Sequence, residues 1–145
     1  DAGARGFRLA SVMGGDTAGG DEVVVLMQRG AGVQGRYRYK LLAASRTATL
    51  EKELNDGARD GFDYVGQTVF NSGFAGDEVV AIVEHRGTAA SDFSYKLLAT
   101  LKTSTLQQEL ADASRAGYEA LGMTVGKTAF GGDEILVILR RRRAP

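Results

Sequence analysis

The 145-residue sequence contains no cysteine, no tryptophan, one histidine and one proline. Without cysteine the chain has no disulfides, no thiolate nucleophile, no iron–sulfur cluster and no cysteine-ligated zinc. His85 stands alone, so a catalytic triad or a metal site with several histidines has nothing else to draw on. The proline is the last residue, so the 20 glycines must supply the turns.

An excess of charge of one sign is also missing, since 18 basic residues balance 18 acidic residues. No overall field therefore directs the chain towards nucleic acid or an anionic membrane. The longest apolar runs, such as VVVLM at 23–27, are far too short to span a bilayer. We expect a soluble protein, compatible with cytoplasm or periplasm, whose length suits one domain.

The main feature that is present is an internal repeat. The motif YKLLA occurs at 39–43 and at 95–99, and 22 of 50 positions are identical when 37–86 is aligned with 93–142. A partial third copy opens the chain, because DAGARGF at 1–7 resembles 56–62 and GDEVV occurs at 20–24 and 76–80. We predict a partial repeat over 1–36 and units over 37–92 and 93–145, which together form one compact domain.

Each full unit predicts strand, helix, strand, strand. Residues 37–44 and 93–100 alternate apolar and polar residues, as a half-buried strand does. Residues 49–61 and 105–117 place leucine or alanine three or four apart, with Thr49 and Thr105 as predicted N-caps and Gly61 and Gly117 as left-handed stops. Strands follow at 62–69 and 118–125, then Gly-rich loops, then apolar strands at 77–86 and 133–142.

The predicted fold class is therefore α+β, with the order ββ followed by βαββ twice. We expect a mixed, mostly antiparallel sheet with both helices on one face. The pattern leaves open whether the units share one continuous sheet.

The first copy lacks the helix that covers its counterparts, which leaves strands 7–13 and 22–28 without a cover. Uncovered apolar strand surface is normally hidden. We therefore expect a protein partner or self-association at these strands, with Tyr37, Tyr39, Phe93 and Tyr95 as candidate contact residues.

Other motifs favour structural readings. The GAGVQG stretch at 30–35 matches a dinucleotide fingerprint, but a strand follows it where a helix is required. The RRRR run at 140–143 favours a solvated end or a contact for an acidic partner over nucleic acid. Acidic pairs recur in all three copies and suggest either hairpin ends or weak candidate ligands for a divalent cation. These pairs are Asp21 and Glu22, Asp77 and Glu78, and Asp133 and Glu134.

The unit resembles a small bacterial domain family of unknown function, whose members often carry Gly-Trp-Glu-Leu at the helix exit. The resemblance lies in Tyr95-Lys96-Leu97-Leu98, in Leu106 and Leu110, in Gly117-Tyr118-Glu119 and in the strand that ends at Arg140 and Arg141. Phe7, Phe62 and Tyr118 stand where the family has tryptophan. The family has no assigned catalytic residues, so the resemblance implies none here.

These observations predict a non-enzymatic structural or protein-interaction module, an accessory subunit of a larger assembly, without a cofactor or catalytic residues. The alternative is a domain that binds a small ligand or a divalent cation.

Overall fold

The computed structural model describes residues 1–32, 35–71, 76–128 and 132–144, which contain two α-helices, one short 3-10 helix and eight strands. The N-terminal hairpin comprises η1 (Gly3–Arg5), β1 (Arg8–Thr17) and β2 (Gly20–Gln28). The middle unit comprises β3 (Arg38–Ala44), α1 (Thr47–Arg59), β4 (Phe62–Asn71) and β5 (Asp77–His85). The C-terminal unit comprises β6 (Phe93–Thr100), α2 (Thr103–Arg115), β7 (Glu119–Lys127) and β8 (Asp133–Arg142).

The predicted α+β class and the order of elements are confirmed. Gly61 and Gly117 have φ angles of +82° and +85°, the left-handed conformation expected after a helix. The predicted N-caps were wrong, because the cap positions lie three residues earlier, at Arg46 and Lys102, and neither residue makes a side-chain cap hydrogen bond. The centres of the Gly-rich loops and of the 30–35 motif lie outside the described residues.

The strands form three sheets instead of one continuous sheet. The hairpin pairs β1 with β2, and the two full units have the orders β3-β5-β4 and β6-β8-β7. All of these pairs are antiparallel. In each full unit, the strand before the helix and the strand after it in sequence therefore run parallel to each other, and the last strand of the unit lies between them. That last strand is paired on both edges within its own unit, so the units stack through side chains.

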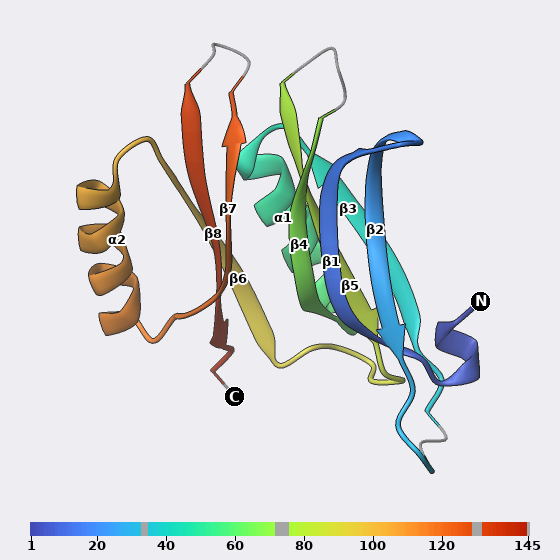
Figure 1. Ribbon diagram of the computed structural model, residues 1–145. Coiled ribbons are helices and arrows are strands. Elements are labelled where there is room, and N and C mark those ends of the chain that lie inside the picture. The colour runs from blue at the N-terminus through green and yellow to red at the C-terminus, as the bar shows by residue number, and fades with distance from the viewer. Residues whose placement is uncertain (33–34, 72–75, 129–131, 145) are drawn as a thin grey trace.

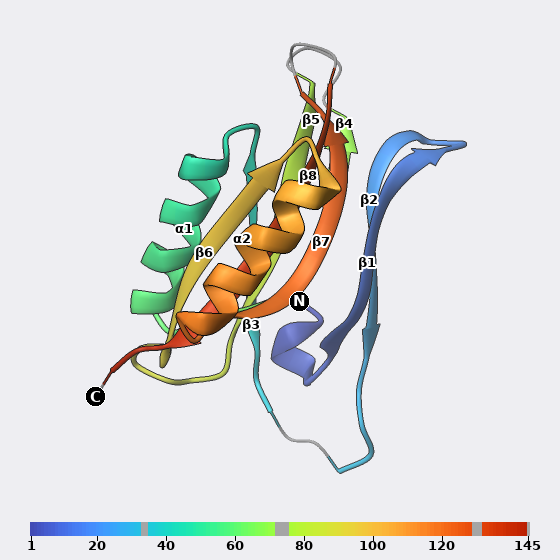
Figure 2. The same ribbon diagram turned by 90° about the vertical axis from the view of Figure 1, so that its left-hand side faces the viewer.

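The stacked layers follow the chain. Figure 1 shows the hairpin, the middle sheet, α1, the C-terminal sheet and α2 in that order. Each α-helix covers the equivalent face of its own sheet, and Figure 2 shows the hairpin on the opposite side of the middle sheet from α1, without an α-helix of its own. No helix in the described part of the chain is long and apolar enough to cross a membrane.

The main core lies around α1, which has apolar neighbours on two sides. Leu50, Leu54 and Ala58 are at most 1% exposed, between residues of the middle sheet and residues of the C-terminal sheet. A second, smaller core lies under α2 and involves the C-terminal sheet alone. The difference follows from position in the stack, since α1 lies between two sheets and α2 packs against one.

Glycine allows β1 to lie directly on β4. A methyl group at Gly14 would overlap the carbonyl oxygen of Val69, and the Gly14 amide donates a hydrogen bond of 2.6 Å to the Thr68 hydroxyl. We expect Gly14→Ala to lower the free energy of unfolding by about 1–3 kcal/mol, because the backbones must separate. Urea unfolding measures this loss.

Gly15 provides the matched control, since a methyl group there would meet nothing within 4 Å. Gly15→Ala should stay within about 0.5 kcal/mol of the parent chain. Equal effects of the two substitutions would contradict the close packing of β1 on β4.

Candidate functional site

The three acidic pairs stand at the starts of β2, β5 and β8, on three separate hairpins. Their side chains have different partners: Glu22 accepts a hydrogen bond from the Thr17 hydroxyl of its own hairpin, and Asp77 accepts one from the amide of Lys127 in the C-terminal unit. Within the described ranges, no three acidic or histidine side chains come close enough to hold a metal ion.

The four aromatic candidates separate into two environments. Tyr95 is 3% exposed in the core around α1 and leaves no surface for a partner to contact. Phe93 is partly buried, and the guanidinium groups of Arg140 and Arg142 lie over its ring. Tyr37 and Tyr39 are also partly buried but belong to the N-terminal part of the stack.

Three side chains of the arginine run, those of Arg140, Arg141 and Arg142, contact aromatic rings within the molecule. Besides its contact with Phe93, Arg140 forms an ion pair of 2.6 Å with Glu119. Arg141 lies over the Tyr118 ring and donates a hydrogen bond to the Ala116 carbonyl. These contacts give the arginines internal partners.

Equivalent positions differ sharply in exposure along the stack. Leu97 of β6 is 6% exposed because α1 covers it, whereas Leu41, its equivalent in β3, is 59% exposed. Similarly, Ile82 of β5 is 2% exposed under the hairpin, whereas Leu26, its equivalent in β2, is 63% exposed. At these two positions the equivalent apolar residues are therefore buried in a later unit and exposed at the start of the chain.

We call this exposed region the N-terminal face, and it has two parts. The outer surface of the hairpin carries Met13, Val24 and Leu26, which are between 46% and 63% exposed. The second part is a groove of about 200 Å³ between the hairpin and β3. Residues 1–3 and side chains of four strands line the groove, and the strand residues are Leu9, Val25, Met27, Tyr39, Leu41 and Ile82.

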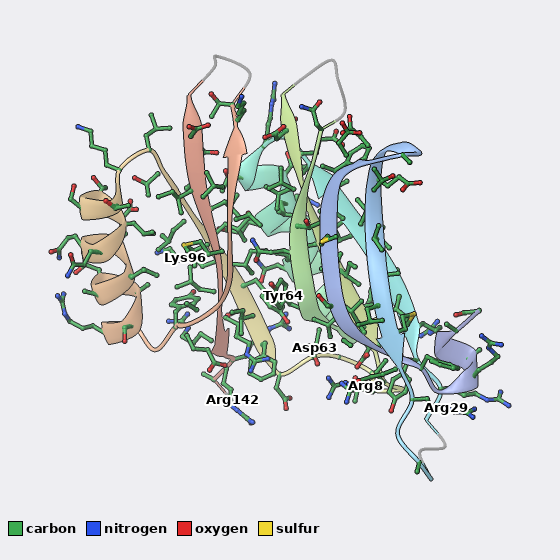
Figure 3. All side chains as sticks on the ribbon, in the orientation of Figure 1. Arg8, Arg29, Asp63, Tyr64, Lys96 and Arg142 are labelled. Atoms are coloured by element: carbon green, nitrogen blue, oxygen red, sulfur yellow. The ribbon has the colours of Figure 1, made fainter. Side chains whose placement is uncertain are left out.

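A buried carboxylate, which sequence analysis did not single out, closes the lower end of this region. The side chain of Glu84 is 1% exposed and accepts hydrogen bonds from Arg8 at 2.9 Å, the Tyr39 hydroxyl at 2.6 Å and Arg86 at 2.6 Å. Figure 3 shows Arg8 at the base of the hairpin, on the side of the middle sheet. The network therefore ties β1 to β3 and β5.

The network also shifts the pKa values of its members. Burial alone would raise the pKa of Glu84, but the hydrogen bonds from Arg8, Tyr39 and Arg86 outweigh burial and hold the pKa below its usual 4.5. Burial and the bond to Glu84 raise the pKa of Tyr39. Glu84 is thus a charged anchor with a protonated tyrosine beside it. The detectable signal was an acid directly after the apolar run 79–83, where the other copies have Gln28 and Arg140.

A larger cavity, of about 620 Å³, lies between the middle and C-terminal units near the start of α1. Two basic and two acidic side chains contribute to its wall, so neither sign of charge dominates: Arg46, Lys127, Asp77 and Glu134. Its volume is within the range of small-molecule sites.

No family model, no curated protein and no solved structure matches this chain.

Proposed function

We propose that this chain is a non-enzymatic protein-interaction module, a subunit of a larger assembly, whose contact surface is the N-terminal face. The observation that carries the proposal is the exposure of Leu41 and Leu26 beside the burial of their equivalents Leu97 and Ile82. The proposal agrees with the family resemblance, which implies no catalytic residues and stays a prediction.

Burial of the exposed apolar residues would provide the driving force for association. Burying one leucine or valine side chain contributes about 1.5–3 kcal/mol. Met13, Val24 and Leu26 lie together on the outer surface of the hairpin, and each is at least 46% exposed. A protein that covers these three side chains gains enough to offset part of the entropy cost of association.

The opposite end of the stack has a different character. Polar residues such as Gln107, Gln108 and Asp112 are exposed on the outer side of α2. The same end also exposes apolar side chains of β7, since Met123 and Val125 are 62% and 58% exposed. The two ends therefore differ in their helices, because α2 covers part of the C-terminal sheet whereas no α-helix covers the hairpin, and we place the protein contact at the N-terminal face.

Sedimentation velocity across a range of protein concentrations tests the proposal. We expect the mass of the parent chain to rise above 15.4 kDa with concentration, and Leu26→Lys to remain at 15.4 kDa. Leu101→Lys is the matched control, because Leu101 is 65% exposed but lies between β6 and α2. A parent chain that stays monomeric at about 200 μM, far above the micromolar constants of weak complexes, would contradict the proposal.

The second candidate function, binding of a small ligand or a divalent cation, is favoured by the cavity between the full units. Its volume of about 620 Å³ and its four charged side chains would suit a small polar ligand. Calorimetric titration with Ca²⁺ and Mg²⁺ tests whether the chain binds a divalent cation. Binding heat that saturates at one ion per chain would support this function, and the absence of binding heat would contradict it.

A further inference from the structure

The groove of the N-terminal face has an occupied equivalent one unit further along the chain. Between the middle and C-terminal sheets, the corresponding space is filled by α1, whose leucines are part of the main core. The six strand residues that line the groove correspond to six residues in that space: Tyr64, Ala81, Val83, Tyr95, Leu97 and Ile138. Five of these six are at most 6% exposed, and Tyr64 is partly buried.

Hydrogen bonds confirm that the two spaces are equivalent. The amide of Tyr64 donates to the Tyr95 hydroxyl at 2.9 Å, and the amide of Leu9 donates to the Tyr39 hydroxyl at 3.3 Å. Figure 3 places Tyr64 in the space between β4 and the C-terminal sheet. The hairpin therefore meets β3 as the middle unit meets β6.

Polar side chains of α1 also complete the open edge of β6. The Asn55 amide group accepts a hydrogen bond from the Tyr95 N–H and donates one to the Tyr95 carbonyl, both at 2.9 Å. Glu51 accepts a hydrogen bond of 2.8 Å from the Leu97 N–H. An edge strand exposes unpaired backbone groups, and here two side chains of a helix satisfy three of them.

The equivalent backbone groups of β3, those of Tyr39 and Leu41, lie at an open edge. Tyr39 pairs with Glu84 in the register in which Tyr95 pairs with Arg140, so its N–H and carbonyl point away from β5. Among the described residues, no side chain bonds to these two groups or to the Leu41 N–H. The groove thus offers an apolar floor together with one acceptor and two donors.

We propose that this groove binds a partner helix with the pattern Leu-Glu-x-x-Leu-Asn, the pattern of α1 from Leu50 to Asn55. The proposal rests on the proposed function and names the chemistry of the partner. The leucines would cover Val25, Leu41 and Ile82, while asparagine and glutamate would pair with the backbone of β3.

The lower end of the groove already holds its own helical turn. The 3-10 helix η1 lies where the last turn of α1 lies in the next unit, since Gly6 donates to Gly3 as Gly61 donates to Ala58. The Tyr37 amide also donates a hydrogen bond of 3.0 Å to the Gly3 carbonyl. The open part of the groove therefore needs a helix of two to three turns.

The helix α2 of a second copy would fit less well. Its leucine spacing is the same, but Gln107 and Ala111 stand in place of Glu51 and Asn55. Alanine offers no group to the Tyr39 N–H or carbonyl, which would be buried without partners at a cost of about 1–3 kcal/mol each. In addition, Leu106 is 7% exposed in the core under α2 and so is not available to a second chain.

A peptide with the sequence of residues 45–56 tests this inference. Short helices are marginal in water, so a lactam bridge should join Lys52 and Asp56, whose side chains form an ion pair of 2.6 Å in α1. Binding of the fluorescein-labelled peptide is measured by fluorescence anisotropy, and the amide NMR signals of Tyr39 and Leu41 locate the site. We expect saturable binding and shifts of both amide signals.

Two variants make the test specific. The peptide with E51Q and N55A, the residues found in α2, should bind at least tenfold more weakly, and Leu41→Lys in the protein should reduce binding of the parent peptide at least tenfold. Leu41 is 59% exposed, so this substitution leaves the core intact. No saturable binding, or equal binding of both peptides, overturns the inference.

The titration should be repeated with Leu26→Lys, which alters the outer surface of the hairpin and leaves the groove unchanged. Failure of the peptide to bind, while Leu26→Lys still abolishes self-association, would refute the helix and leave the proposed function standing. Peptide binding by a chain that never self-associates would support the helix and contradict the proposed function.

Discussion

Leu54→Ala should lower the free energy of unfolding by about 2–5 kcal/mol, the largest loss that we expect from a single apolar truncation. Leu54 is 0% exposed, and its neighbours belong to two sheets on opposite sides of α1. The substitution would leave a cavity between the two sheets, and the sheets cannot both move inwards to fill it. Urea denaturation followed by circular dichroism measures the loss.

The repeat supplies the control for this experiment. Leu110 occupies the same position in α2 but is only partly buried, against one sheet. Leu110→Ala should therefore cost no more than about half as much, because less contact area is lost. Equal losses would show that α1 does not connect the two full units.

Glu84→Ala should destabilise the chain by about 3 kcal/mol or more at neutral pH, because removal of one partner breaks a buried charged network. Three hydrogen bonds end on this carboxylate, and its side chain is 1% exposed. Arg8 and Arg86 are 42% and 48% exposed and remain hydrated, which keeps the loss at the lower end of the range for buried pairs. Thermal unfolding at pH 7 measures the effect.

The same network predicts a dependence on pH. Because the pKa of Glu84 is lowered in the folded chain, its contribution is complete above the usual value of 4.5 and is lost as the pH falls through the folded pKa. Between about pH 5 and pH 3 the parent chain should therefore lose more stability than Glu84→Gln does. Parallel curves for the two proteins would mean that Glu84 is not held charged by its neighbours.

Local patterns were sufficient for the elements of the unit. Alternation along 93–100 and the spacing of Leu106 and Leu110 identified a strand and a helix, because these periods depend on neighbouring residues alone. The helix starts were misplaced by three residues, since Thr49 and Thr105 fit the N-cap preference but lie inside the first turn. Helix ends were better defined, because Gly61 and Gly117 are tolerated where φ is positive.

The candidate site was predicted in outline. The missing helix of the first copy indicated an uncovered apolar surface, and Leu41 and Leu26 lie on the N-terminal face. The groove and its backbone groups were not predictable, because they depend on how the hairpin meets β3. Tyr95 illustrates the limit: it repeats Tyr39 in sequence, yet α1 buries it and leaves Tyr39 at the open edge.

The sequence by itself determined the order of strands and helices and the similarity of the two full units to each other. These features depend on residue types and periods within a few tens of residues. The tertiary structure alone decided that the strands divide into three sheets, that Glu84 joins Arg8 across 76 positions and that Asn55 completes the edge of β6. Such contacts join residues far apart in the chain, and only the stacking of the units brings them within hydrogen-bond distance.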